Sequence, residues 1–195
     1  MNFTFTRHSQ IPDIILVDCL KKFDDHRGFF LESFRLDEFE SNGILPMVQE
    51  NRSHSIKGTL RGLHYQLNPK AQGKLVSCVS GSILDIALDI RKGSPTYGKY
   101  VSVPLVGDFP RMVYVPPGFA HGFLVDSTFP QQAKVVYKTT EYFCAECDRC
   151  IRWNDPDLNI SWGFLPGEME GLKMSYKDKN APLLKNAENN FVWGQ

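Results

Sequence analysis

Three side chains suited to proton chemistry lie close together in this sequence. Arg61, His64 and Lys74 fall within fourteen residues of one another. Histidine titrates near neutral pH, so it can accept or donate a proton under ordinary conditions. A second histidine, His121, follows a Pro-Pro-Gly turn. This combination of residue types indicates acid–base chemistry.

Both histidines stand in short segments that resemble the two motifs of cupin barrels. The first cupin motif has a glycine, five residues and then His-x-His, and here Gly58 precedes His64-Tyr65-Gln66 at that spacing. The second motif, Pro-x-Gly-x-x-His, matches residues 116–121. Metal-binding cupins use these histidines with a carboxylate to hold one cation, but Gln66 replaces the second histidine. Two imidazoles without a third strong ligand make a poor divalent-metal site, so we predict no metal.

The elements that must position these residues are short strands. Residues 83–90 alternate, with Leu84, Ile86, Leu88 and Ile90 on one face and Asp85 and Asp89 on the other. Similar strands are expected at residues 29–34, 75–79, 100–105, 111–115 and 133–139, and short helices at 36–41 and in part of the stretch from 167 onward. We therefore predict an all-β fold, a cupin-like jelly-roll β-barrel with a few short helices. In such a barrel, the face that carries Asp85 and Asp89 lines a cavity.

The bulk composition narrows the class of protein. At 195 residues, 42% of them hydrophobic and 23% charged, the chain suits a single globular domain and excludes global disorder. Lys plus Arg and Asp plus Glu both number 22, which gives no basic excess for nucleic acid. No apolar run approaches the roughly 18 residues of a membrane span, and residues 1–7 do not resemble a signal peptide. We expect a cytoplasmic protein without nucleic-acid or membrane partners.

Three of the five cysteines, Cys144, Cys147 and Cys150, are spaced as Cys-x-x-Cys-x-x-Cys. A closed zinc site takes four ligands, and Asp148 is the only nearby residue that could complete the set. Free thiols in a surface connection are the simpler interpretation. A disulfide between two of these cysteines stays open as an alternative.

A longer series of segments resembles one enzyme family over about residues 11–184. In order, the matching segments are residues 25–32, 49–53, 60–66, 72–76, 89–98, 117–123, 137–138, 153–156 and 177–184. Together they are similar to the dTDP-4-dehydrorhamnose 3,5-epimerases, which are isomerases of dTDP-L-rhamnose biosynthesis. The resemblance implies a dTDP-linked 4-keto-6-deoxyhexose as substrate, inversion at C3 and C5 through enolates, no cofactor and a homodimer.

The resemblance also implies roles for particular residues. His64 matches the general base, Asp178 the carboxylate that orients it, and Tyr137 the acid on the opposite face of the sugar. Lys74 matches the cation beside the C4 oxygen, where enolate charge develops. The remaining expected substrate contacts are Arg27, Phe30, Glu32, Gln49, Glu50, Asn51, Arg61, His121, Tyr142, Asp148 and Lys177. Arg27 and Arg61 suit the diphosphate because guanidinium binds phosphate bidentately, and the segment 27–32 can serve the partner's pocket.

The sequence departs from the family pattern in three places. Asp148 stands where glutamate is more common, the turn at 128–132 is long, and residues 185–195 extend beyond the usual end. We expect one epimerase domain over 1–195, with its core at about 11–184 and a C-terminal extension at 185–195. Three rival functions stay open: a single-carbon epimerase, a nucleotide-binding module without catalysis, and a metal-dependent cupin.

Overall fold

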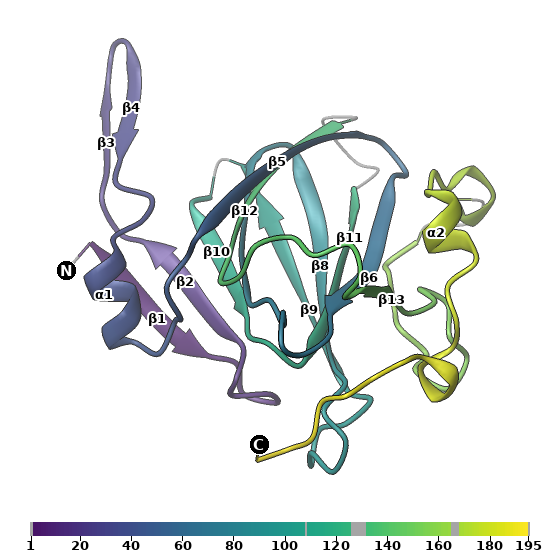
Figure 1. Cartoon of the computed structure of the whole chain (residues 1–195). Coiled ribbons are helices and arrows are strands. Elements are labelled where there is room, and N and C mark those ends of the chain that lie inside the picture. Colours follow the sequence, from purple (N-terminus) through teal and green to yellow (C-terminus); the bar gives the residue numbers. More distant parts are fainter. Residues whose placement is uncertain (1, 108, 126–131, 165–167, 195) are drawn as a thin grey trace.

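Two antiparallel sheets face each other in the computed structural model, which describes residues 2–107, 109–125, 132–164 and 168–194 (Figure 1). The first sheet has the strand order β1 (Phe3–Arg7), β2 (Ile15–Cys19), β10 (Arg111–Val115), β7 (Lys74–Ser80), β12 (Gln132–Thr139) and β5 (Gln49–Ile56). The second has the order β13 (Asp148–Cys150), β6 (Leu60–Gln66), β11 (Phe119–Val125), β8 (Ser82–Asp89) and β9 (Tyr100–Val106). We call these the six-stranded and the five-stranded sheet.

The remaining elements are short. A separate hairpin consists of β3 (Lys22–Asp25) and β4 (Gly28–Leu31), and it extends away from the two sheets (Figure 1). The helices are α1 (Leu36–Ser41) and α2 (Tyr176–Lys179), with 3-10 turns η1 (Glu168–Gly171) and η2 (Leu184–Asn186). No helix among the described residues is long and apolar enough to cross a bilayer.

Alternation along the strands builds the core between the sheets. Val76 and Val135 of the six-stranded sheet share one buried cluster with Ala87, Val103 and Phe123 of the five-stranded sheet. Burial of such side chains stabilises the fold by roughly 25 cal/mol for each Å² of apolar surface removed from water. The core therefore fixes the distance between the two sheets, and with it the distance between residues on opposite walls of any cavity between them.

The outer face of each sheet is also covered. Ile86 and Leu88 of β8 point away from the first core and pack with Trp153 and Phe191, so the C-terminal stretch covers the five-stranded sheet. Phe39 of α1 packs edge-on against Phe3 at 5.0 Å between ring centroids and covers the six-stranded sheet. Since both faces of the central strands are buried, these strands contain long apolar runs.

The all-β, cupin-like prediction is confirmed, although the two sheets do not join into a closed barrel. The expected strand at 29–34 is shorter and belongs to the protruding hairpin, while the helix at 36–41 is found as α1. The face of β8 that carries Asp85 and Asp89 is buried, at 1% and 0% exposure. Ile83 and Ala87 of the same face pack in the core, and no described residue of β8 lines the cavity between the sheets, so the expected cavity-lining role is not found. The long turn at 128–132 lies outside the described residues except for its last residue.

The C-terminal extension packs on its own chain. The backbone of Phe191 accepts a hydrogen bond from Lys92, and the Trp193 amide donates to the Lys92 carbonyl. The Arg91 guanidinium lies 4.3 Å from the centroid of the Trp193 ring. The extension therefore covers the loop after β8.

Candidate active site

One cavity of about 470 Å³ collects most of the expected site residues. It lies between the two sheets, and strands β5, β6, β7, β12 and β13 and helix α2 each contribute at least one side chain. The expected residues that line it are Gln49, Asn51, Arg61, His64, Lys74, Tyr137, Asp148, Lys177 and Asp178. Residues far apart in the sequence, from position 49 to position 178, therefore share one cavity.

A bulge in β6 brings Arg61 and His64 to the same cavity. Strict alternation places residues three apart on opposite faces of a strand. Between β6 and β11, however, His64 pairs with His121 and Arg61 pairs with Phe123, so β6 has one residue more than β11 over this stretch. The extra residue places Arg61 and His64 on the same face of β6, because a bulge shifts the alternation of side chains by one residue. The guanidinium Nε of Arg61 donates to Ser55 Oγ at 3.0 Å.

His64 forms a close pair with Asp178. The distance from His64 Nε2 to Asp178 Oδ1 is 2.5 Å, and the Asp178 side chain is almost fully buried. Burial alone raises the pKa of this carboxyl, but hydrogen bonds from His64, Ser175 and Cys150 lower it on balance. Asp178 is therefore ionised at neutral pH and accepts the Nε2 proton, which leaves the lone pair on Nδ1.

The local sequence around α2 fixes the Asp178 carboxylate. Ser175 caps this short helix and accepts a hydrogen bond from the Asp178 amide at 3.1 Å. In return, the Ser175 hydroxyl donates to Asp178 Oδ2 at 2.9 Å. The Ser-x-x-Asp spacing is that of a capping box, although the Asp178 carboxylate bonds here to the Ser175 hydroxyl and not to the Ser175 backbone N–H. Each oxygen of the carboxylate thus has a partner, Oδ1 with His64 and Oδ2 with Ser175.

Lys74 supplies a buried positive charge. Its side chain is 7% exposed, and burial lowers its pKa from 10.5 to about 8, while Asp148 and Asp85 partly offset the shift. The ammonium is therefore mostly protonated at pH 7 and close to losing its proton. A buried cation of this kind stabilises negative charge that develops nearby on a ligand.

Tyr137 enters the cavity from the six-stranded sheet, opposite His64 on the five-stranded sheet. Burial raises the pKa of its hydroxyl, with Arg61 opposing and Asp148 adding to the shift. The hydroxyl therefore stays protonated at neutral pH and can act as a proton donor. Because the two sheets face each other, His64 and Tyr137 approach a ligand from opposite walls.

Two glutamines and one ion pair complete the lining of the cavity. Gln66 donates to the Lys70 carbonyl at 2.6 Å and accepts from the Cys144 amide at 2.9 Å, so it joins two loops. Gln72 donates to the Glu141 carbonyl at 2.7 Å. Asp148 and Lys177, which also line the cavity, form an ion pair. Gln66, at the position of a cupin metal ligand, therefore serves as a structural link between loops.

His121 is buried and does not line the cavity within this chain. It lies in strand β11 and not in the turn before it, and its Nε2 is 2.7 Å from Asp85 Oδ2. Burial raises the pKa of the Asp85 carboxyl, although His121 and Lys74 oppose that shift. Glu50 also points away from the cavity, because it alternates with Gln49 and Asn51 on β5, and it pairs with Lys138.

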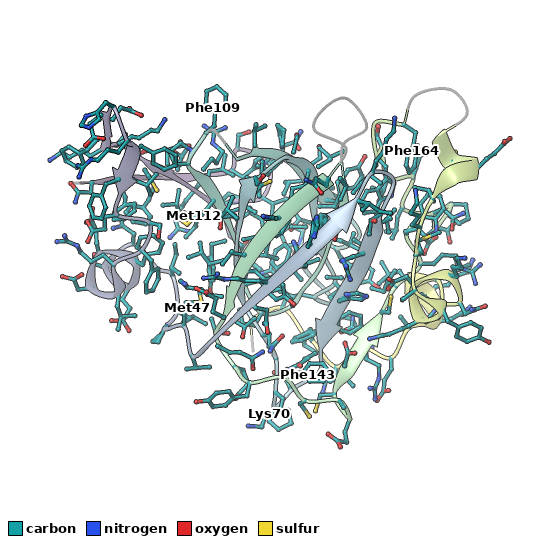
Figure 2. All side chains as sticks on the ribbon, turned by 90° about the horizontal axis from the view of Figure 1, so that it is seen from above. Met47, Lys70, Phe109, Met112, Phe143 and Phe164 are labelled. Carbon is teal, nitrogen blue, oxygen red and sulfur yellow. The ribbon has the colours of Figure 1, made fainter. Side chains whose placement is uncertain are left out.

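The hairpin residues lie apart from the cavity of their own chain. Arg27 and Phe30 are exposed on β3–β4, and the Arg27 guanidinium bonds to Asp25. Glu32 bonds to Arg35 at the base of the hairpin. Tyr142 is 61% exposed beside Phe143, which lines the cavity and is labelled in Figure 2 near Lys70. The roles of Arg27, Phe30, Glu32 and Tyr142 in substrate binding therefore remain predictions.

Sequence reasoning did not select Ser175 or Cys150. The Ser-x-x-Asp capping pattern could have identified Ser175. The Cys150 thiol lies 3.5 Å from Asp178 Oδ1, and burial together with Asp178 raises its pKa to about 12. Cys144 and Cys147 are free thiols with their Sγ atoms 2.9 Å apart.

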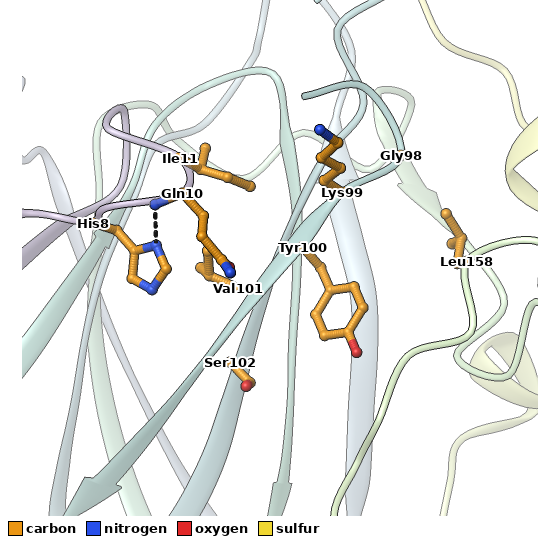
Figure 3. A pocket seen from close by; sticks show the side chains of 9 residues that line it. All are labelled: His8, Gln10, Ile11, Gly98, Lys99, Tyr100, Val101, Ser102 and Leu158. Atoms are coloured by element: carbon orange, nitrogen blue, oxygen red, sulfur yellow. Dashed lines mark hydrogen bonds between the residues drawn. The ribbon is translucent and has the colours of Figure 1, made fainter. Parts of the chain in front are cut away.

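A second hollow lies at the outer edge of strand β9, away from the paired charges described above (Figure 3). Its lining residues are His8, Gln10, Ile11, Gly98, Lys99, Tyr100, Val101, Ser102 and Leu158. His8 Nδ1 accepts a hydrogen bond from the Gln10 amide at 3.3 Å. None of the described residues that line this hollow carries a carboxylate, so the His64 cavity is the better candidate for acid–base chemistry.

Comparison with known proteins identifies close relatives over most of the chain. Residues 8–186 match the family model described as dTDP-4-dehydrorhamnose 3,5-epimerase. A Shigella flexneri protein named dTDP-4-dehydrorhamnose 3,5-epimerase is 49% identical over 182 residues, covering 92% of this chain and 96% of the relative. A Streptomyces sp protein named dTDP-4-dehydro-6-deoxyglucose 3-epimerase is 37% identical, covering 84% of this chain and 81% of the relative.

A solved structure agrees with the fold. A crystal structure of a dTDP-6-deoxy-D-glucose-3,5-epimerase from Legionella pneumophila Philadelphia 1, in complex with dTDP-4-keto-L-rhamnose, superposes with a TM-score of 0.85. Its sequence is 41% identical, and the match covers 94% of each chain. The similarity therefore extends over nearly the whole chain.

Proposed function

This chain belongs to the dTDP-4-dehydrorhamnose 3,5-epimerase family, and we propose that its His64 cavity performs the epimerisation by proton transfer from two sides. The enzyme is an isomerase that converts dTDP-4-dehydro-6-deoxy-D-glucose into dTDP-4-dehydro-L-rhamnose. The C4 ketone of this sugar acidifies the hydrogens on C3 and C5, so each carbon can be inverted through an enolate. Side chains are sufficient for each step of this chemistry.

The proposal rests on one observation: two groups in different protonation states, His64 and Tyr137, lie on opposite walls of the cavity. His64 has its Nε2 proton held by the ionised carboxylate of Asp178, so Nδ1 is available as a base. Tyr137, on the other sheet, keeps its hydroxyl proton because burial raises its pKa. A sugar ring between the two sheets can lose a proton on one face and gain one on the other, which is what inversion requires.

Lys74 supports the intermediate. When a proton leaves C3 or C5, negative charge moves to the C4 oxygen, and the buried ammonium of Lys74 can neutralise it. Because the charge is greater in the enolate than in the ketone, this contact lowers the barrier more than it strengthens substrate binding.

The nucleotide end of the substrate requires contacts at the mouth of the cavity. Arg61 is held by Ser55 through one guanidinium nitrogen, which leaves its terminal amino groups for a diphosphate. Gln49 and Asn51 lie on the same face of β5, and their side chains are hydrogen-bonded to each other at 2.9 Å. We assign these residues to the diphosphate and the nucleoside.

A homodimer completes the proposed site. Arg27, Phe30 and Glu32 belong to the β3–β4 hairpin or its base, which does not reach the cavity of its own chain. The hairpin also exposes apolar side chains that a lone chain leaves in water, with Phe29 at 57% and Phe30 at 71% exposure. We propose that the hairpin of one protomer contributes these residues to the partner's nucleotide site. Cytoplasmic location and the absence of nucleic-acid and membrane partners stay predictions.

The assignment of His64 is tested by substitution. We predict that His64→Ala lowers kcat by at least about 10²-fold, because general-base catalysis contributes roughly 10²–10⁴-fold. Binding of dTDP, measured by isothermal titration calorimetry, should change little, since the diphosphate contacts lie elsewhere in the cavity. The matched control is His54→Ala, an exposed histidine bonded to Gln132, which should retain activity. Epimerisation by His64→Ala at the wild-type rate would refute the assignment.

A further inference from the structure

A third group lies directly behind the His64–Asp178 pair. Strand β13 runs beside β6, and Cys150 pairs with His64 in their register. The Cys150 Sγ lies 3.5 Å from Asp178 Oδ1, the same oxygen that His64 Nε2 approaches at 2.5 Å. The Cys150 and Asp178 side chains are both buried, so water does not separate the three groups. One nitrogen, one sulfur and one oxygen therefore converge on a single point.

We propose that His64, Cys150 and Asp178 form a binding site for a thiophilic divalent cation of the zinc class, which inhibits the enzyme. Their three potential ligand atoms lie within 4.8 Å of one another. Zinc bonds of about 2.3 Å to sulfur and about 2.0 Å to oxygen or nitrogen, at tetrahedral angles, separate sulfur from oxygen by about 3.5 Å. The observed separation of Cys150 Sγ and Asp178 Oδ1 is 3.5 Å.

The distance between the nitrogen and the oxygen ligands needs only a small adjustment. Tetrahedral geometry separates a nitrogen and an oxygen ligand by about 3.3 Å, compared with 2.5 Å between His64 Nε2 and Asp178 Oδ1. His64 is partly exposed on the cavity side, so its ring has room to move outward by the difference. A water molecule from the cavity can take the fourth position.

The ligand types favour zinc over the magnesium that accompanies nucleotides. A thiolate and an imidazole are suitable ligands for zinc, whereas magnesium requires a shell of oxygen atoms. The thiolate and the carboxylate together balance the charge of a divalent cation. The proposed site shares His64 with the cupin metal site but differs in its other ligands, because the corresponding residues Gln66 and His121 are bonded to the Lys70 carbonyl and to Asp85.

Proton balance explains why this cation inhibits the enzyme. Binding at Cys150 releases the thiol proton to solvent, and binding at His64 displaces the proton from Nε2. The imidazole stays neutral as a zinc ligand, so its proton moves to Nδ1. Nδ1 then has no lone pair with which to abstract a proton from the sugar. This consequence rests on the proposed role of His64, whereas binding of the metal does not.

The test uses the full-length protein after removal of metals with a chelator. Zinc chloride is titrated by calorimetry, and cobalt chloride is added as a spectroscopic substitute whose thiolate charge-transfer band reports a Co–S bond. We expect one cation per chain and a Co–S band in the wild type. Cys150→Ser keeps a hydroxyl donor for Asp178 but lacks the thiolate, so we expect affinity to fall by at least ~10-fold and the band to disappear.

The matched control is the double variant Cys144→Ser/Cys147→Ser, which removes the other pair of nearby thiols. This variant should retain both the cation and the band. Loss of the band in the control, or its persistence in Cys150→Ser, would overturn the proposed site, as would the absence of zinc binding by the wild type. Circular dichroism of each variant verifies that it is folded.

Activity measurements separate the metal site from the proposed function. We expect added zinc to inhibit epimerisation by the wild type and a chelator to restore it, whereas the activity that Cys150→Ser retains should resist zinc. If zinc binds through Cys150 without slowing epimerisation, the metal site stands but the proposed inhibition is overturned, and the His64→Ala variant then decides whether His64 is the base.

Discussion

At the scale of single residues, burial and hydrogen bonding set the protonation states on which the proposed mechanism depends. Asp178 is ionised because three donors outweigh its burial, and Tyr137 stays protonated because burial raises its pKa. Lys74 responds in the opposite direction, since burial disfavours its charged form. The same cavity thus holds a carboxylate, a neutral phenol and an ammonium that is close to losing its proton.

The lowered pKa of Lys74 predicts an alkaline limit to activity. Its ammonium is charged below about pH 8 and neutral above it, so kcat should fall as the pH rises through about 8, by up to about tenfold per unit. The measurement is kcat against pH from 6 to 10. Lys74→Met has no charge at any pH, so its weaker activity should lack this fall near pH 8. A wild-type profile that stays level up to pH 10 would contradict the role of Lys74.

The sequence could predict many site residues but not the groups that support them. Motif resemblance assigned His64 and Asp178 to one site although 114 positions separate them, and the structure brings them to 2.5 Å. Cys150 could not be assigned in this way, because nothing in its spacing indicates that β13 pairs with β6 beside His64. Such a contact depends on strand order, which a local pattern does not reveal.

At the scale of elements, the site depends on the bulged pairing of β6 and β11. The expected strands did not include residues 49–56, 60–66 or 119–125, which form β5, β6 and β11. Alternation is hidden in β6 by the bulge near Gly62, and β11 is buried along its whole length. In β5, the polar side chains that face the cavity obscure the usual apolar face. These are the strands that carry much of the site.

Gly62 and Gly122 lie in close contact at the bulge, so a substitution at Gly122 tests the bulged pairing of β6 and β11. A Cβ on Gly122 would lie 2.7 Å from the Arg61 carbonyl and 3.0 Å from Gly62 Cα. Since these neighbours are backbone atoms, Gly122→Ala should push β11 from β6 and lower the free energy of unfolding by about 1–3 kcal/mol. Gly171→Ala is the control, because a Cβ there meets nothing within 4 Å.

Chemical denaturation at one protein concentration measures both variants. The Gly171 variant should stay within about 0.5 kcal/mol of the wild type. Gly122→Ala should also lose activity, because displacement of β11 moves His64. Equal stabilities for the two variants would show that the contact between Gly62 and Gly122 is not a constraint on this pairing.

At the scale of the whole molecule, the two sheets provide opposite walls for the substrate, and the hairpin points to a second chain. The periodicity of residues 83–90 predicted a cavity-lining strand, but Asp85 and Asp89 are buried and no described residue of β8 lines the His64 cavity. It could not predict that the two sheets remain open at their edges, because strand order is a property of the complete fold. Likewise, no single-chain pattern reveals where a protruding hairpin binds.

We predict that the protein is a dimer and that Phe30→Ser weakens it. Phe30 on the hairpin and Phe109 elsewhere are both 71% exposed, so Phe109→Ser is a matched control. Light scattering coupled to size exclusion should show a shift toward monomer for the Phe30 variant alone. A higher KM for the sugar nucleotide should accompany that shift if the hairpin serves the partner's site. A monomeric wild type would contradict this prediction.

The most direct test of the account follows the protons themselves. The purified protein is incubated with dTDP-4-dehydro-6-deoxy-D-glucose in deuterated water without added metal, and the sugar is analysed by NMR. Proton transfer from two walls of the cavity predicts deuterium at both C3 and C5 of a product with both centres inverted. Label at one carbon would indicate a single-carbon epimerase, and the absence of label at both would contradict catalysis by His64 and Tyr137.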